Sequence, residues 1–224
     1  MPLPTDTSLA IYTDGACKPN PGPGGWAAIV LAADTRTEIA GGFRRTTNNR
    51  MEIFAAIAGL RSVSAPSSVT LFSDSQYLVK AMSRGWVKRW AANAWMRTAT
   101  EAALNADLWR ELQALSEQHD VQFRWVRGHA SDRHNQDCDR LAGEASRRPS
   151  LPADSVYEQE LLSGRPRGQW SRSSKPRQKT LPRTYHEMSP LDQAVQEERE
   201  VLRLRVEEQM RSRKYDKSRR RRLF

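Results

Sequence analysis

Four acidic side chains occupy positions where a folded chain could use them for chemistry. Asp14 and Asp74 each end a short apolar run typical of a strand, whereas Glu52 and Asp139 lie within segments of helical pattern. Ligand crevices of α/β sheets form at the C-terminal ends of strands. Carboxylate oxygens suit Mg²⁺ or Mn²⁺, and two such ions can hold the attacking and leaving oxygens of a phosphoryl transfer. The residue types therefore indicate a metal-dependent site.

The same aspartates also have a structural interpretation. An aspartate at the end of a strand often caps the following helix or turn with its side-chain oxygen. Periodicity alone does not place Glu52 beside Asp14. On spacing alone, a metal site and a set of caps both stay open.

The elements that must position these residues follow from the apolar pattern. We expect the segment rich in Pro and Gly, residues 18–25, to be a loop, because Pro cannot donate to a ladder. A hairpin comes first and later strands are separated by helices, which predicts a layered α/β domain. The expected strands are 8–14, 26–33, 37–45, 69–74 and 121–126, and the expected helices are 48–60, 75–83, 104–118 and 135–147.

Charge divides the chain into unequal parts. The 224 residues contain 36 Lys and Arg against 26 Asp and Glu, a formal net charge of +10. Residues 1–149 hold 18 basic and 15 acidic residues, and residues 150–224 hold 18 and 11. The second part is also poorer in apolar residues, so it is not expected to bury a core. We predict a folded domain at 1–149, a disordered linker at 150–189 and a basic helix and tail at 190–224.

Composition also excludes several classes of protein. The sequence has no apolar run long enough to span a membrane and does not begin with a signal-peptide pattern. Two cysteines, Cys17 and Cys138, are too few for a disulfide scaffold or a zinc cage, which favours a reducing cytoplasm. The basic balance favours nucleic acid or another polyanion as the partner.

Six sequence blocks, taken together, resemble the bacterial ribonuclease HI family. They occur in the family's order and at nearly its separations, across about residues 8–147. The blocks are Tyr12–Cys17, Asn20–Trp26, Thr46–Glu52, Asp74–Tyr77, Val126–Ala130 and Asn135–Ala142. This resemblance implies a ribonuclease H-like fold for residues 1–149, with a five-stranded mixed sheet whose first three strands are antiparallel and which helices flank.

The resemblance also implies an activity. It is the endonucleolytic hydrolysis of the RNA strand of RNA–DNA hybrids by two Mg²⁺ ions per site, with Mn²⁺ as a possible substitute, giving 5′-phosphate and 3′-hydroxyl ends. The implied metal ligands and catalytic carboxylates are Asp14, Glu52, Asp74 and Asp139. His129 matches a loop histidine that assists proton transfer or product departure, a task suited to its ordinary pKa. By itself, a histidine in a Gly-His-Ala loop is more typical of a plain surface position.

Substrate contacts are implied on both strands of the hybrid. Four residues match contacts to the 2′-hydroxyls and the adjoining groove, partly through backbone atoms: Cys17, Asn20, Asn48 and Gln76. Thr47 and Asn48 match a pocket for a DNA-strand phosphate. An aromatic protrusion that binds the DNA strand is matched by Trp86, Trp90 and Trp95. Without the resemblance, these polar residues are ordinary loop and cap residues, and the tryptophans belong equally well to a core. Gln136 stands where the family often has Glu, which we expect to change metal affinity at most.

The basic region after residue 149 is the largest departure from the family. A helix is predicted from about Ser189 to Lys214, before the run Arg219–Arg222. It could be a solvated charged helix, an electrostatic tether for a duplex, or a helix that binds another protein. We expect a cytoplasmic monomer. The competing functions are a non-catalytic hybrid-binding module and a related superfamily nuclease, such as an integrase or resolvase, that acts on DNA.

Overall fold

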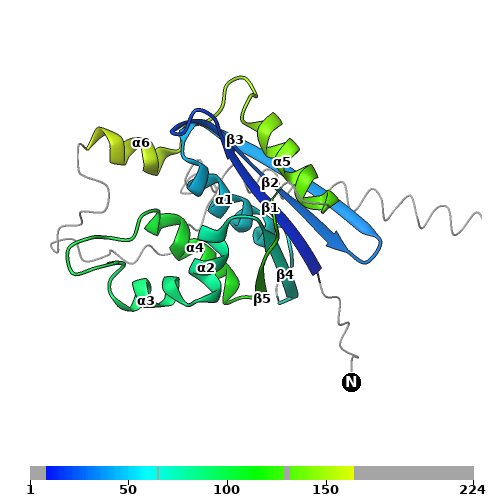
Figure 1. The fold of residues 1–224 in the computed structure, drawn as a ribbon, viewed down its shortest axis with the longest axis horizontal. Coiled ribbons are helices and arrows are strands. Elements are labelled where there is room, and N and C mark those ends of the chain that lie inside the picture. Colours follow the sequence, from blue (N-terminus) through cyan, green and yellow to red (C-terminus); the bar gives the residue numbers. More distant parts are fainter. Residues whose placement is uncertain (1–8, 65, 129–131, 164–224) are drawn as a thin grey trace, which may run out of the picture. The chain divides into compact units, whose positions relative to one another are not determined.

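The computed structural model describes residues 9–64, 66–128 and 132–163. Five strands form one mixed sheet in the order β3-β2-β1-β4-β5 (Figure 1). The pairs β1–β2 and β2–β3 are antiparallel, whereas β4 is parallel to both β1 and β5. The predicted five-stranded sheet with three antiparallel strands first is therefore confirmed. The strands are β1 (Leu9–Cys17), β2 (Gly22–Ala32), β3 (Thr35–Thr46), β4 (Ser68–Ser73) and β5 (Asp120–Trp125).

Helices cover both faces of this sheet (Figure 1). A Cβ atom on Gly24 would meet Met51 of α1, and one on the next residue, Gly25, would meet Ala142 of α5. Successive residues of a strand face opposite sides, so α1 and α5 lie on opposite faces. The described helices are α1 (Asn48–Arg61), α2 (Gln76–Ser83), α3 (Trp86–Ala92), α4 (Ala106–Ser116), α5 (Arg133–Ala145) and α6 (Ser155–Leu162). None of these described helices is long and apolar enough to cross a membrane.

Helix α1 is the most deeply enclosed element. Its residues from Arg50 through Leu60 are all buried, because the sheet lies on one side and α4 packs on the other. The apolar and small residues around the helix suit this position between two layers. One consequence matters for function: Glu52, in the second turn, is held inside the protein rather than on its surface.

The predicted loop at residues 18–25 is too long. Strand β2 begins at Gly22, and the connection to β1 is correspondingly shorter. A register shift between Gly22 and Gly24 leaves Pro23 out of the ladder, so its missing N–H costs no hydrogen bond. Residues 18–21 are thus the loop that was predicted, whereas residues 22–25 belong to β2, where the proline lies at a β-bulge.

The structure also differs from the predicted linker in its first residues. Residues 150–163 pack against the domain: the Arg44 N–H donates to the Pro152 carbonyl at 2.8 Å, and Tyr157 of α6 is buried. Composition did not reveal this docking because few apolar side chains take part and polar contacts carry it. The rest of the predicted linker and the predicted basic helix lie outside the described residues.

Candidate active site

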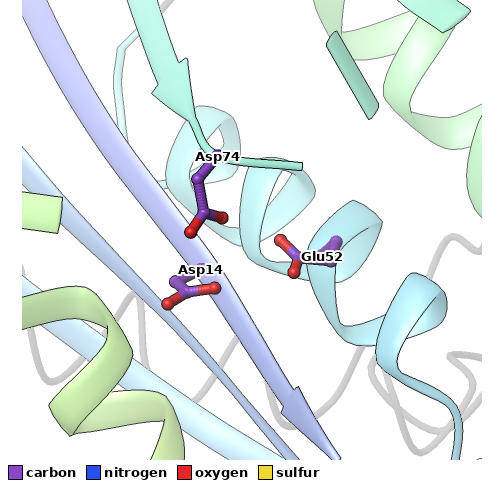
Figure 2. A group of neighbouring side chains, drawn as sticks. All are labelled: Asp14, Glu52 and Asp74. Carbon is purple, nitrogen blue, oxygen red and sulfur yellow. The ribbon is translucent and has the colours of Figure 1, made fainter. Parts of the chain in front are cut away.

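Three carboxylates meet at one place beside the sheet (Figure 2). Asp14 comes from β1, Glu52 from α1, and Asp74 follows the end of β4, and each offers an oxygen within 4.8 Å of the others. The parallel pairing of β1 and β4 ends at Thr13 and Ser73, so the two aspartates are the next residues along neighbouring strands. Asp14 lies inside β1 rather than at its end, and it is the pairing with β4 that stops there.

Gly15 allows the third carboxylate to reach this place. A Cβ atom on Gly15 would lie 2.4 Å from the backbone nitrogen of Glu52, a distance that no side chain tolerates. Helix α1 can therefore rest directly on β1 and bring Glu52 towards Asp14. The Gly15 N–H also donates to Oδ1 of Asp14 at 2.7 Å, which holds that carboxyl in place.

Crowding and burial make the charged state of this cluster costly. Burial and the charges of Asp74 and Asp139 together raise the pKa of Asp14 from its ordinary value of 3.8 to about 8, and the hydrogen bond from Gly15 opposes this rise. Burial and the charges of Asp14 and Asp74 raise the pKa of Glu52 well above its usual range. Like charges at close range each favour the protonated form of the other.

The donor set fits divalent cations. Oε1 of Glu52 accepts from Nδ2 of Asn48 at 3.2 Å, whereas its buried Oε2 has no hydrogen-bond partner among the described residues. A buried acceptor without a partner is costly, and a cation would both bind it and neutralise the neighbouring carboxylates. Oxygen-only donors of this kind suit Mg²⁺ and Mn²⁺.

Asp139 occupies a different environment from the other three predicted ligands. It lies on α5, is exposed and is not a member of the three-carboxylate group. It is close enough for its charge to raise the pKa of Asp14. Gln136, on the same helix, is also exposed. The metal-binding role of Asp139 stays a prediction, and His129 lies outside the described residues.

Three of the predicted substrate residues gather where α1 begins. Oδ1 of Asn20 accepts from the Asn48 N–H at 3.2 Å. Thr47 is the N-cap residue of α1, but its side chain makes no capping hydrogen bond there. Asn20 and Thr47 line a pocket of about 390 Å³, together with Asn105 and Arg110. The hydrogen-bonding groups in this pocket suit a polar ligand.

The side chain of Cys17 faces the protein. It is 4% exposed, and its Sγ lies 3.2 Å from the Pro19 carbonyl oxygen. Any substrate contact at this position would therefore come from the backbone. Gln76, at the start of α2, is exposed, and its Oε1 accepts from Nζ of Lys80 at 2.6 Å.

Two of the three predicted tryptophans, Trp86 and Trp90, line a groove of about 860 Å³. Trp95 does not line it, and its ring packs against the Arg110 guanidinium, with 5.0 Å between the guanidinium carbon and the ring centroid. The ring centroids of Trp86 and Trp90 are 6.4 Å apart, and both side chains are half-buried. Trp90 also packs on Trp109 of α4, so it serves the core as well as the groove. Arg89 and Arg97 line the same groove. It adjoins the smaller pocket, since residues 102–104 line both.

Two relationships escaped the sequence prediction. Gly128 approaches Asp74 so closely that a Cβ atom there would lie 2.4 Å from Oδ2 of Asp74.

The second of these contacts involves Arg50, which forms ion pairs with Asp107 and Asp154. The position of Arg50 within the block Thr46–Glu52 was the available signal, but a pattern of residue types does not identify partners so distant along the chain.

The fold and the cluster together define a class of protein. It is an α/β domain with a cluster of carboxylates, of the kind that binds divalent cations, at the point where the pairing of β1 with β4 ends. The model of the RNase H family matches residues 6–147. A Ribonuclease H from Syntrophus aciditrophicus (strain SB) is 56% identical over 149 residues, covering 66% of this chain and 86% of the relative. One from Rippkaea orientalis is 53% identical over 150 residues, covering 67% of this chain and 92% of the relative.

The comparison with solved structures points to the same family as the sequence comparisons. LC9-RNase H1, described as a type 1 RNase H with the type 2 active-site motif, is 31% identical with a TM-score of 0.58. The match covers 72% of this chain and 83% of that one. The chain therefore belongs to the RNase H family, metal-dependent endoribonucleases that cleave the RNA strand of RNA–DNA hybrids.

Proposed function

We propose that this chain hydrolyses the RNA strand of RNA–DNA hybrids by a two-metal-ion mechanism. The observation that carries the proposal is the group formed by the buried Asp14 and Glu52 with the half-buried Asp74, in which one oxygen of Glu52 lacks a protein partner among the described residues. Membership of the RNase H family supports the choice of substrate.

Asp14, Glu52 and Asp74, with Asp139 from α5, would hold two Mg²⁺ ions, for which Mn²⁺ could substitute. When bound, such ions activate a water molecule and stabilise the leaving 3′ oxygen, which gives 5′-phosphate and 3′-hydroxyl ends. The chain itself fixes the carboxylates. The Gly15 N–H holds Asp14, and Asn48 donates to Oε1 of Glu52, which leaves Oε2 available to a cation.

His129 supplies the remaining polar group. In this proposal its imidazole takes or delivers a proton at the leaving group, or helps the product to depart. The imidazole side chain of histidine suits both tasks, because it can give and take a proton near neutral pH. Because the carboxylates do most of the work, the histidine is an auxiliary group.

Both strands of the hybrid would have their own contacts. The RNA strand would be distinguished by its 2′-hydroxyls, which Asn20, Asn48, Gln76 and the Cys17 backbone could contact. A DNA-strand phosphate would bind at Thr47, and the DNA strand would pass the groove lined by Trp86 and Trp90. Contacts of these kinds read shape rather than bases, so sequence preference should be weak.

Two competing functions are less well supported. A non-catalytic binding module would have no need to hold three carboxylates close together, two of them buried, at the electrostatic cost that this implies. A nuclease that acts on DNA is disfavoured by relatives at 53–56% identity that are named Ribonuclease H. A monomeric state, a cytoplasmic location and a tail that binds nucleic acid or protein stay predictions.

A substrate panel tests the proposal. Labelled RNA–DNA, RNA–RNA and DNA–DNA duplexes would be incubated with the full chain in Mg²⁺, in Mn²⁺ and in chelator. We expect cleavage of the RNA strand of the hybrid alone, no cleavage in chelator, and fragments that carry 5′-phosphate. Cleavage of DNA–DNA duplexes would favour the competing nuclease, and binding without cleavage would favour the non-catalytic module.

A further inference from the structure

A buried arginine connects the start of α1 to two distant parts of the chain. The side chain of Arg50 is 3% exposed. Its Nη1 and Nη2 donate to the two oxygens of Asp107, at the start of α4, at 2.9 and 2.7 Å. Its Nε and Nη2 donate to the two oxygens of Asp154 at 2.7 and 2.9 Å. A guanidinium can satisfy two carboxylates in this way because its donors form a rigid planar fork.

Asp154 is the most connected of these partners. Besides Arg50, its Oδ2 accepts from Oγ1 of Thr46, the last residue of β3, at 2.7 Å. Its Oδ1 accepts from the Tyr157 N–H at 3.3 Å and so caps α6. Tyr157 is 1% exposed, and the Arg50 guanidinium carbon lies 5.9 Å from its ring centroid. One carboxylate therefore joins the end of β3, the start of α1 and the start of α6.

These contacts surround residues assigned above to substrate binding. Thr46 and Arg50 stand on either side of Thr47 and Asn48 in the chain. The pocket of about 390 Å³ that Asn20 and Thr47 line is completed from α6 by Val156 and Glu160. The segment that Asp154 anchors thus forms one wall of the pocket. It also lies beyond residue 147, where the match to the family model ends.

We propose that Asp154 is a positioning residue for substrate binding, fixing Thr47 and Asn48 through Thr46 and Arg50 and holding α6 as a wall of their pocket. The proposal rests on the proposed function, because its effect is measured on hybrid cleavage. It differs from a merely structural role. A residue that only stabilises the fold would change the fraction of protein that is folded. A positioning residue changes the affinity for the hybrid in protein that is fully folded.

The carboxylate cluster should be insensitive to this contact. Asp14, Glu52 and Asp74 are placed by the pairing of β1 with β4 and by the close approach at Gly15, neither of which involves α6. Loss of the Asp154 charge leaves Arg50 with Asp107 alone and turns an amide donor towards its N–H groups. The start of α1 and the wall of the pocket then loosen. The hydrogen bond from Asn48 to Glu52 weakens with them, but the close backbone approach of Gly15 to Glu52 still holds the reacting centre.

The test compares Asp154→Asn with Glu158→Gln in the full chain. Glu158 lies on the same helix but pairs with Arg44, whose side chain is 62% exposed, so its loss removes an ion pair from α6 without touching Arg50. Steady-state kinetics on an RNA–DNA hybrid would be measured well below the melting temperature of each variant. For Asp154→Asn we expect KM to rise about 10-fold with kcat within about twofold. Glu158→Gln should match the wild type.

Asp154→Glu is the second variant, because it retains the charge. We expect its KM to lie between those of the wild type and Asp154→Asn, and if Asp154→Asn does not fold, a raised KM in Asp154→Glu supports the proposal. An unchanged KM in every folded Asp154 variant overturns it, as does an equal rise in Glu158→Gln. A wild-type chain that cleaves no hybrid would instead contradict the proposed function, so the two failures are distinguishable.

Discussion

Gly128 packs directly on Asp74: a Cβ atom on the glycine would lie 2.4 Å from Oδ2 of the carboxylate. The indole Nε1 of Trp125 donates to the Asp74 carbonyl oxygen at 3.0 Å. Strand β5 and the segment after it therefore help to position one of the three clustered acids.

Substitution of this glycine should impair catalysis. In Gly128→Ala the new methyl group must displace either the loop or the Asp74 carboxylate, and we expect kcat to fall about 10-fold or more. The matched control is Gly143→Ala on α5, where a Cβ would meet only the flexible Arg147 guanidinium at 3.6 Å. Cleavage rates and melting temperatures of both variants check this. An active Gly128→Ala enzyme would show that the contact does not constrain Asp74.

The metal-free protein should become less stable as pH rises, because the carboxylate cluster then loses the proton that it retains in the folded state. The pKa of Asp14 is raised from 3.8 to about 8, so between these values the folded state retains a proton that the unfolded state has lost. Such a group contributes stability at low pH, and this contribution is lost as pH rises through about 8. Glu52 acts in the same direction, since its pKa is also raised.

Asp14→Asn isolates this effect. The amide can keep the hydrogen bond from Gly15 but carries no charge, so in chelator the variant should melt above the wild type by about 5 °C near pH 9, with a smaller difference near pH 5. Thermal melts across this range measure the difference. Addition of Mg²⁺ should stabilise the wild type more than the variant. A difference that does not depend on pH would contradict the assignment of a raised pKa.

Removal of His129 should slow the enzyme without stopping it. General acid–base groups contribute about 10²-fold or more, so His129→Ala should retain a measurable fraction of turnover with an unchanged Mg²⁺ requirement. The measurement is kcat on a hybrid at saturating Mg²⁺. Complete loss of cleavage would make the histidine essential, and an unchanged rate would leave it without a role; either result contradicts an auxiliary function.

The basic region beyond the described residues can be tested by truncation. A chain ending at residue 163 keeps α6, Asp154 and the pocket wall, and should therefore keep its activity. If the tail is an electrostatic tether, hybrid affinity and the dependence of that affinity on salt should both decrease, because fewer phosphate contacts release fewer counterions. Filter binding at several salt concentrations measures both quantities. Equal affinity at every salt concentration would eliminate the tether.

The residue pattern alone predicted the sheet, whereas the carboxylate cluster could be predicted only with the family resemblance. Alternating apolar runs located all five strands, and the block resemblance brought Glu52 to Asp14, which periodicity could not do because the contact depends on Gly15. The starting point of β2 was wrong because a bulge makes Pro23 compatible with a strand. The docking of residues 150–163 was missed because a few directed contacts of Asp154 carry it, and composition does not register such contacts.

The central claim is that Asp14, Glu52 and Asp74 together hold the divalent cations that cleave the hybrid. The most direct measurement is the rate of RNA-strand cleavage by the wild type and by Asp74→Asn as Mg²⁺ is varied, with circular dichroism to verify folding. The account predicts Mg²⁺-dependent cleavage by the wild type and a loss of at least about 10³-fold in the folded variant. Near-wild-type cleavage by folded Asp74→Asn would contradict it.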